Sequence, residues 1–112
     1  MHIDSTQFGN VVIDGEKYSQ VLIIGDSVVE RDDVKLQEIY GTSHKIGEWE
    51  VQELLKEDPE IIVIGTGQNG AMKIDLKLEG VEIISDITPK AIEIFNKKSK
   101  NKKVNALIHT TC

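Results

Sequence analysis

Short apolar runs separated by turn residues dominate the first third of the chain. Residues 11–13 and 18–24 are such runs, and Asp14-Gly15 between them tolerates the positive φ of a tight hairpin turn. A second turn signal at residues 25–27 precedes Val28 and Val29. The pattern predicts an N-terminal antiparallel hairpin followed by a third short strand.

Helical periodicity begins after residues 32–47, a turn-rich stretch that we expect to lie on the surface as a loop. The predicted helix begins at Gly47 or Glu48. It ends before Asp58-Pro59, because proline disfavours a helical conformation in the residue that precedes it. Its predicted buried face carries Trp49, Val51, Leu54 and Leu55.

Strands and helices alternate in the second half of the chain. Residues 60–65 and 81–86 are runs rich in Ile and Val, typical of strands covered on both faces, and only a short helix at 74–78 fits between them. Thr88-Pro89 then predicts an N-cap followed by proline at the first helical position. The next run, 104–109, alternates as a last strand. The buried side of the intervening helix carries Ala91, Ile92, Ile94 and Phe95.

This order of elements predicts a three-layer α/β fold with a mixed central β-sheet, flanking helices and an N-terminal β-hairpin. Right-handed crossovers place the strands that begin at residues 60, 81 and 104 side by side and parallel, and the hairpin joins one edge of that sheet. The chain has 112 residues, of which 39% are hydrophobic and 29% charged. These values are typical of a single domain, here residues 1–112.

The charge balance argues against a broad surface for nucleic acid, since the formal net charge is −6. No segment approaches the ~18 consecutive apolar residues that span a bilayer, and the single cysteine, Cys112, has no partner for an intramolecular disulfide. We therefore expect a cytoplasmic protein that binds neither nucleic acid nor membranes. One lysine cluster, which we interpret as a solvated helix end, comprises Lys97, Lys98, Lys100, Lys102 and Lys103.

The segment Gly65-Thr66-Gly67-Gln68-Asn69-Gly70 has the spacing G-x-G-x-x-G and follows a predicted strand, and Asp86 ends the next strand. In dinucleotide-binding folds such glycines let the backbone approach a pyrophosphate. The segment that follows is too short for the helix of a ~30-residue βαβ unit, which favours a plain strand-to-helix turn. A third interpretation keeps exposed amides of this turn as an anion site close to Lys73.

Other chemistry-bearing residues have weaker patterns. His109 and Cys112 form an H-x-x-C pair, but a zinc site needs three or four ligands, and His2 and His44 lack ligand spacing. We assign no metal, no cofactor and no catalytic residue from the sequence. Arg31 offers two parallel donors for a carboxylate or phosphate, although a surface ion pair with its acidic neighbours is the favoured interpretation.

Several separate segments, taken in order along almost the whole chain, resemble the small Mth-domain family. They are Phe8-Gly9, Ile13-Asp14-Gly15, the strand 61–64 with Gly65-Thr66-Gly67, Ala71-Met72-Lys73, the spacing of Thr88, Ala91 and Phe95-Asn96, and residues 109–112. The family includes uncharacterised prokaryotic proteins, the adipogenesis-associated Mth-domain-containing protein and a mitochondrial complex I assembly factor. The resemblance implies the same three-layer α/β fold with a hairpin layer, and it implies no established catalytic activity.

The positions that match polar parts of the family pattern define our expected site. We expect Arg31, His44 and Lys73 to converge on the turn formed by Gly65, Thr66 and Gly67, making a pocket for a small anion or an acidic residue of a partner. The leading hypothesis is a non-enzymatic module that binds or assembles an unidentified protein partner, with homo-oligomerisation left open. The alternative is a small-molecule binder, or an enzyme, for an anionic ligand at the Gly65–Gly70 turn.

Overall fold

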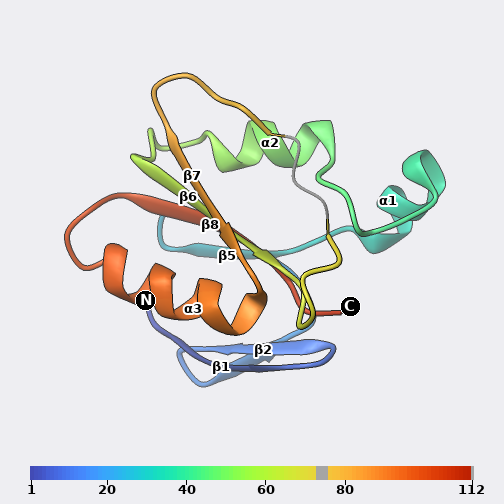
Figure 1. Ribbon diagram of the computed structural model, residues 1–112, viewed down its shortest axis with the longest axis horizontal. Helices are drawn as coiled ribbons and strands as arrows, with labels where there is room; N and C mark the ends of the chain where they lie inside the picture. Colours follow the sequence, from blue (N-terminus) through green and yellow to red (C-terminus); the bar gives the residue numbers. More distant parts are fainter. Residues whose placement is uncertain (73–75, 112) are drawn as a thin grey trace.

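The computed structural model describes residues 1–72 and 76–111, which form an α/β domain (Figure 1). Two sheets and the helices that cover them account for its layers. Along the chain the elements are β1 (Ile3–Gln7), β2 (Asn10–Ile13), β3 (Glu16–Tyr18), β4 (Val21–Ile24), β5 (Ser27–Glu30), α1 (Asp33–Tyr40), α2 (Glu48–Leu54), β6 (Ile61–Thr66), β7 (Glu82–Asp86), α3 (Thr88–Lys98) and β8 (Val104–His109).

The central sheet has five strands in the order β5-β4-β8-β6-β7. Strand β6 runs parallel to both β7 and β8, so the predicted trio of adjacent parallel strands is confirmed. The register of β6 and β8 pairs Ile61 with Val104 and Thr66 with His109. Strand β4 joins β8 antiparallel and β5 joins β4 antiparallel, which makes the sheet mixed as expected.

The N-terminal hairpin differs from the prediction. The turn at Asp14-Gly15 does connect antiparallel strands, β2 and β3. The run 18–24, however, is divided between two sheets: β3 belongs to a separate three-stranded sheet, β1-β2-β3, and β4 belongs to the central sheet. The polar pair Ser19-Gln20 lies at the crossing, and both residues form hydrogen bonds there, Ser19 through its carbonyl to Thr110 and Gln20 through its side chain. The central sheet therefore has β5, not the hairpin, at its edge.

The core has one part on each face of the central sheet because successive residues of a strand point to opposite faces. Ile61 and Val63 of β6 pack with Phe95 of α3 and with the small sheet. Ile62 and Ile64 pack on the other face, against Leu54 of α2 and other aliphatic side chains. Figure 1 shows α2 on one side of the sheet and α3, with β1 and β2, on the other.

Two further predictions, the loop at 32–47 and the helix at 74–78, differ from the structure where it describes them. The expected loop at 32–47 contains α1, whose start is capped by the Asp32 side chain accepting from the Lys35 N–H at 3.0 Å. The sequence pattern did not indicate this helix because Leu36 is its only buried residue. The predicted helix at 74–78 is absent from residues 76–78, and positions 74 and 75 lie outside the described residues.

The Asn96 side chain forms hydrogen bonds between α3 and the small sheet. Asn96 accepts a hydrogen bond from the Ile3 N–H through Oδ1 and donates to the Ile3 carbonyl through Nδ2, both at 2.8 Å. The side-chain amide of Asn96 thus makes the same two hydrogen bonds that the backbone of a neighbouring strand would make. The N–H and carbonyl of Ile3 therefore both have partners where the Ile3 side chain enters the core.

We expect Asn96→Ala to lower the free energy of unfolding by about 1–3 kcal/mol, because it leaves the partly buried Ile3 N–H and carbonyl without partners. Urea titration measures this difference. The matched control is Asn101→Ala, at an exposed position after α3, which we expect to be near neutral. Equal effects of the two substitutions would contradict the assignment.

Candidate functional site

A buried ion pair lies where β5 ends and α2 begins. Arg31 donates from Nε and Nη2 to the two carboxylate oxygens of Glu50, each at 2.8 Å, and both side chains have 0% exposure. Its remaining donors reach the Gln20 Oε1 at 3.0 Å and the carbonyls of Ser43 and Lys45 at 3.1 and 2.8 Å. All five guanidinium N–H groups therefore have acceptors within the fold. The surface ion pair expected between Arg31 and its neighbours Glu30 and Asp32 is wrong.

Glu50 also organises the start of α2. Its Oε1 accepts the Gly47 N–H at 2.9 Å, which is the reciprocal half of a capping box. The buried positions of α2 are Glu50 and Leu54, so the inward face differs from the predicted face of Trp49, Val51, Leu54 and Leu55. Sequence reasoning missed Glu50 because a carboxylate is rarely buried unless it is paired, and its partner lies 19 residues away.

The network continues from Arg31 to His109, the last residue of β8. Gln20 Oε1, which accepts from Arg31, also contacts Nδ1 of His109. Because an amide oxygen only accepts, His109 carries its proton on Nδ1. Its ring meets that of His44 edge-on, with 4.9 Å between centroids. Burial, followed by the positive charges of Arg31 and His44, lowers the pKa of His109 to about 4, so the ring is neutral near pH 7.

The glycine turn is closed by hydrogen bonds of its own. Gly67 donates its N–H to Thr88 Oγ1 at 2.9 Å, and its carbonyl accepts from the Gly70 N–H and the Thr88 N–H at 3.3 and 2.9 Å. Thr88 Oγ1 in turn donates to the His109 carbonyl. A Cβ on Gly65 would come within 2.8 Å of Thr88 Oγ1, so glycine is needed there for close packing.

These bonds correct the prediction for Thr88. The N-cap of α3 is Ile87, which makes no side-chain cap, and Thr88 is the first helical residue. The Thr88 hydroxyl is instead used between the glycine turn and β8. A threonine hydroxyl can either cap a helix or bridge two segments. It bridges here because β8 places the His109 carbonyl within its reach.

The structure brings together part of the expected set. Arg31 reaches His109 through Gln20, His44 contacts its ring, and Thr66 lies opposite it in the β6–β8 register. Thr66 is itself bonded, donating from Oγ1 to the Asp86 carbonyl at 3.0 Å. Gly65 and Gly67 face Thr88 instead. Lys73 lies outside the described residues.

A cavity of about 490 Å³ opens beside this network. Its walls include the aliphatic side chains of Ile46, Val51, Ala71 and Leu76. Lys45 and Glu48, both exposed, and the half-buried His44 line it as well. The composition suits an apolar group flanked by polar contacts, because a few polar groups around an apolar lining orient a ligand without binding its whole surface.

An aromatic pair holds α1 beside α2. The rings of Tyr40 and Trp49 stack with centroids 6.2 Å apart, Lys35 lies 4.2 Å over Trp49, and Lys45 lies 4.6 Å over Tyr40. Such cation–π contacts at exposed sites contribute about 0.5–1 kcal/mol each. Since α1 buries only Leu36, this column of four side chains fixes the segment that leads into the cavity wall at His44 and Lys45.

Within the described ranges, no helix combines the length and apolar composition that a membrane span requires. Across residues 1–72 and 76–111, no group of three or more His, Cys, Asp and Glu side chains is placed to hold a metal ion.

Solved structures share this fold. The conserved hypothetical protein PH1505 from Pyrococcus horikoshii OT3 is 29% identical, with a TM-score of 0.85 over 100% of both chains. A structure titled MT938 is 34% identical, with a TM-score of 0.85 over 99% of this chain and 98% of that one. An outer membrane protein from Bartonella henselae, 17% identical over 98% and 94% of the two chains, has a TM-score of 0.73 and shows the fold alone.

The family model described as "Protein of unknown function (DUF498/DUF598)" matches residues 3–109, and the chain belongs to this family. No protein with a curated functional description matches the chain.

Breaking the buried ion pair is expected to be costly. Glu50→Ala should lower the free energy of unfolding by about 3–5 kcal/mol, because it leaves the Arg31 charge buried without its partner. The control is Glu53→Ala, which removes an exposed pair with Lys56 and should cost less than about 1 kcal/mol. The double variant Arg31→Met/Glu50→Leu should recover most of the loss. Chemical denaturation of all three tests this, and a mild effect of Glu50→Ala would contradict it.

His109 should make folding sensitive to mild acid. Its pKa is about 4 in the folded chain against an ordinary value of 6.5, so between these pH values the unfolded chain binds a proton that the folded chain does not. The stabilisation is fully present above pH 6.5 and falls by about 1.4 kcal/mol per unit as the pH drops towards 4. Unfolding measured from pH 7 to 5 should show this slope in the parent and in the exposed control His2→Gln, and lose it in His109→Gln.

Proposed function

We propose that this protein is a non-enzymatic binding module that receives an apolar side chain of a protein partner in the cavity beside His44. The observation that carries the proposal is the cavity itself, about 490 Å³ with Ile46, Val51, Ala71 and Leu76 in its walls. Glu48 and Lys45, whose ammonium also lies over the Tyr40 ring, have opposite charges and are exposed, so both can meet polar groups around the inserted side chain.

The wall of this cavity formed by residues 43–50 is held in place by hydrogen bonds within the fold. The carbonyls of Ser43 and Lys45 accept from Arg31, and Glu50 holds the Gly47 N–H, so the backbone from 43 to 50 is bonded at both ends of the wall. A preorganised surface loses little conformational entropy on binding, which favours affinity from a small contact area.

The alternative, an anionic ligand at the Gly65–Gly70 turn, has less support. An anion that approached Arg31 would have to displace Glu50 and three further acceptors. At the turn, the Gly67 and Gly70 N–H groups are already bonded to Thr88 Oγ1 and to the Gly67 carbonyl. Displacing buried internal bonds adds a penalty that a preformed anion site does not have.

We extend the proposal to an assembly role in the cytoplasm. Its support is the resemblance to the Mth-domain family, which includes a complex I assembly factor and the adipogenesis-associated protein, together with the single cysteine. A scaffold with a rigid core and one apolar cavity is suited to holding a partner without altering it. The occupant is a different protein or a second copy of this chain.

Filling the cavity should abolish binding without unfolding the protein. Ala71 is exposed on the cavity wall, so Ala71→Phe places an aromatic ring where the partner side chain would lie. We expect affinity purification with the parent protein from cells of the source organism to recover a stoichiometric partner, and Ala71→Phe to lose it. Glu93→Phe, exposed on α3, adds the same ring elsewhere and should keep the partner.

Two measurements make this test decisive. Sedimentation of the purified parent and of Ala71→Phe identifies a second copy of the chain as the occupant if only the parent self-associates. A thermal-shift series with phosphate, nucleotides and carboxylates addresses the alternative, since a ligand at a hundredfold its Kd adds about 2.7 kcal/mol of stability. A partner retained by Ala71→Phe, or a clear stabilisation by one of these anions alone, would contradict the proposal.

A further inference from the structure

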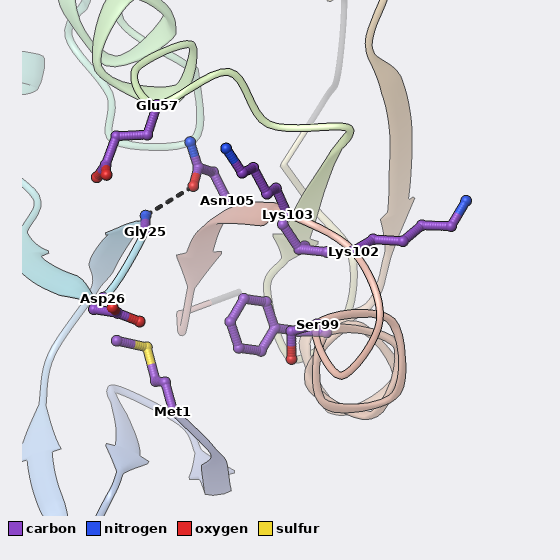
Figure 2. Close-up of a pocket in the computed structure, with 10 residues that line it drawn as sticks. Met1, Gly25, Asp26, Glu57, Ser99, Lys102, Lys103 and Asn105 are labelled. Carbon is purple, nitrogen blue, oxygen red and sulfur yellow. Dashed lines mark hydrogen bonds between the residues drawn. The ribbon is translucent and has the colours of Figure 1, made fainter.

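A second cavity, of about 310 Å³, lies at the opposite end of β8, where that strand begins. Figure 2 shows it between the β4–β5 turn, the end of α3 and the segment after α2. Phe95 and Val104, both buried, provide an apolar surface. Asp26, Glu57 and Lys103 bring charges of both signs to the lining.

These charges have no partners within the described part of the chain. Neither Asp26 nor Glu57 forms an ion pair there, although Glu57 lies in the same lining as Lys103. Ser99, whose hydroxyl makes no hydrogen bond among the described residues, lines the cavity at the end of α3, and in Figure 2 its hydroxyl points away from the Lys103 ammonium. Lys102 also lines the cavity, but in Figure 2 its side chain extends away from the others.

The wall of the cavity that carries Asp26 and Glu57 is held by hydrogen bonds of Asn105. Asn105 accepts the Gly25 N–H through Oδ1 at 2.9 Å and donates through Nδ2 to the carbonyls of Leu54 and Lys56 at 2.8 and 2.9 Å. One buried amide thus ties the β4–β5 turn to the end of α2. The Glu57 carboxylate lies directly over Gly25, where a Cβ would clash with its Oε2.

Glu57 has an unfavourable backbone conformation for its residue type. Its φ is +63°, and that of Asp58 is +50°; aspartate adopts such values more often than most residues do, but glutamate rarely does. Glycine at position 57 would relieve the cost of this conformation, so the folded chain does not need a glutamate there for stability. Compared with glycine, glutamate at position 57 therefore adds a carboxylate to the cavity lining.

We propose that this cavity binds a small zwitterion, namely a free amino acid with an aliphatic side chain. The ammonium group would lie between Asp26 and Glu57, the carboxylate would meet Lys103, and the side chain would lie on Phe95 and Val104. Each charge of such a ligand meets an unpaired group of opposite sign, and charge-assisted hydrogen bonds are the strongest class available to it. The cavity is separate from the one beside His44, so a ligand here leaves the partner site open.

The test is an NMR titration of the full chain with leucine, leucinamide, which lacks the carboxylate, and N-acetylleucine, which lacks the ammonium. Titration to about 20 mM detects a Kd in the millimolar range. Leucine should shift the amide signals of Gly25, Ser99 and Asn105. Each analogue should bind about tenfold more weakly, the loss expected for one charge-assisted contact.

Substitutions test which side chain contacts the ammonium group and which contacts the carboxylate of leucine. Glu57→Gln should weaken leucine about tenfold and leave N-acetylleucine unchanged, and Lys103→Gln should weaken leucine and leave leucinamide unchanged. Glu93→Gln and Lys100→Gln, exposed charges of α3 and its end, are the matched controls and should bind leucine as the parent does. Glu57→Gly should keep or raise the Tm while weakening leucine, which a purely structural glutamate would not do.

Several results would overturn the proposal. These are no shift of the cavity amides with leucine, equal binding of leucine and either analogue, or unchanged leucine affinity in both Glu57→Gln and Lys103→Gln. Ala71→Phe should bind leucine normally, so failure at one cavity is distinguishable from failure at the other.

Discussion

Strand β8 joins the two parts of the molecule, because it pairs antiparallel with β4 from the first half of the chain and parallel with β6 from the second. All six of its residues are buried, from Val104 to His109. Its position between β4 and β6 requires that each polar side chain it carries be satisfied locally, since water does not reach it. Asn105 and His109, at its two ends, meet this requirement in ways that shape the surface nearby.

Each of these two polar residues lies behind a cavity. Asn105 binds the main chain at the β4–β5 turn and the end of α2, which positions the wall that carries Glu57. His109 contacts Gln20 and His44, and through Gln20 it joins Arg31 and Glu50 behind the apolar cavity. Hydrogen bonds that satisfy a buried strand therefore also hold one wall of each cavity in place.

Arg31 could bind a ligand or hold the fold together, and in this structure it holds the fold together. A guanidinium on the surface is suited to binding phosphate or carboxylate, but here Glu50 takes both of its parallel donors and backbone carbonyls take others. A buried pair of this kind is costly to desolvate, and its benefit is geometric: it sets where β5 ends, where α2 starts and how the loop between α1 and α2 runs. The Arg31 charge therefore serves the architecture of the fold.

The sequence alone determined the three parallel strands of the central sheet, because Ile- and Val-rich runs such as 61–66 and 104–109 are apolar enough to be buried in a sheet. It also indicated the turn at Asp14-Gly15 and the helix after Thr88. Only the tertiary structure decided that residues 18–24 divide between two sheets, that Glu50 faces inward, and that His44 meets His109, since each depends on a partner distant in the chain. Local patterns record which residues avoid water, whereas the pairing of polar groups depends on long-range packing that no local pattern contains.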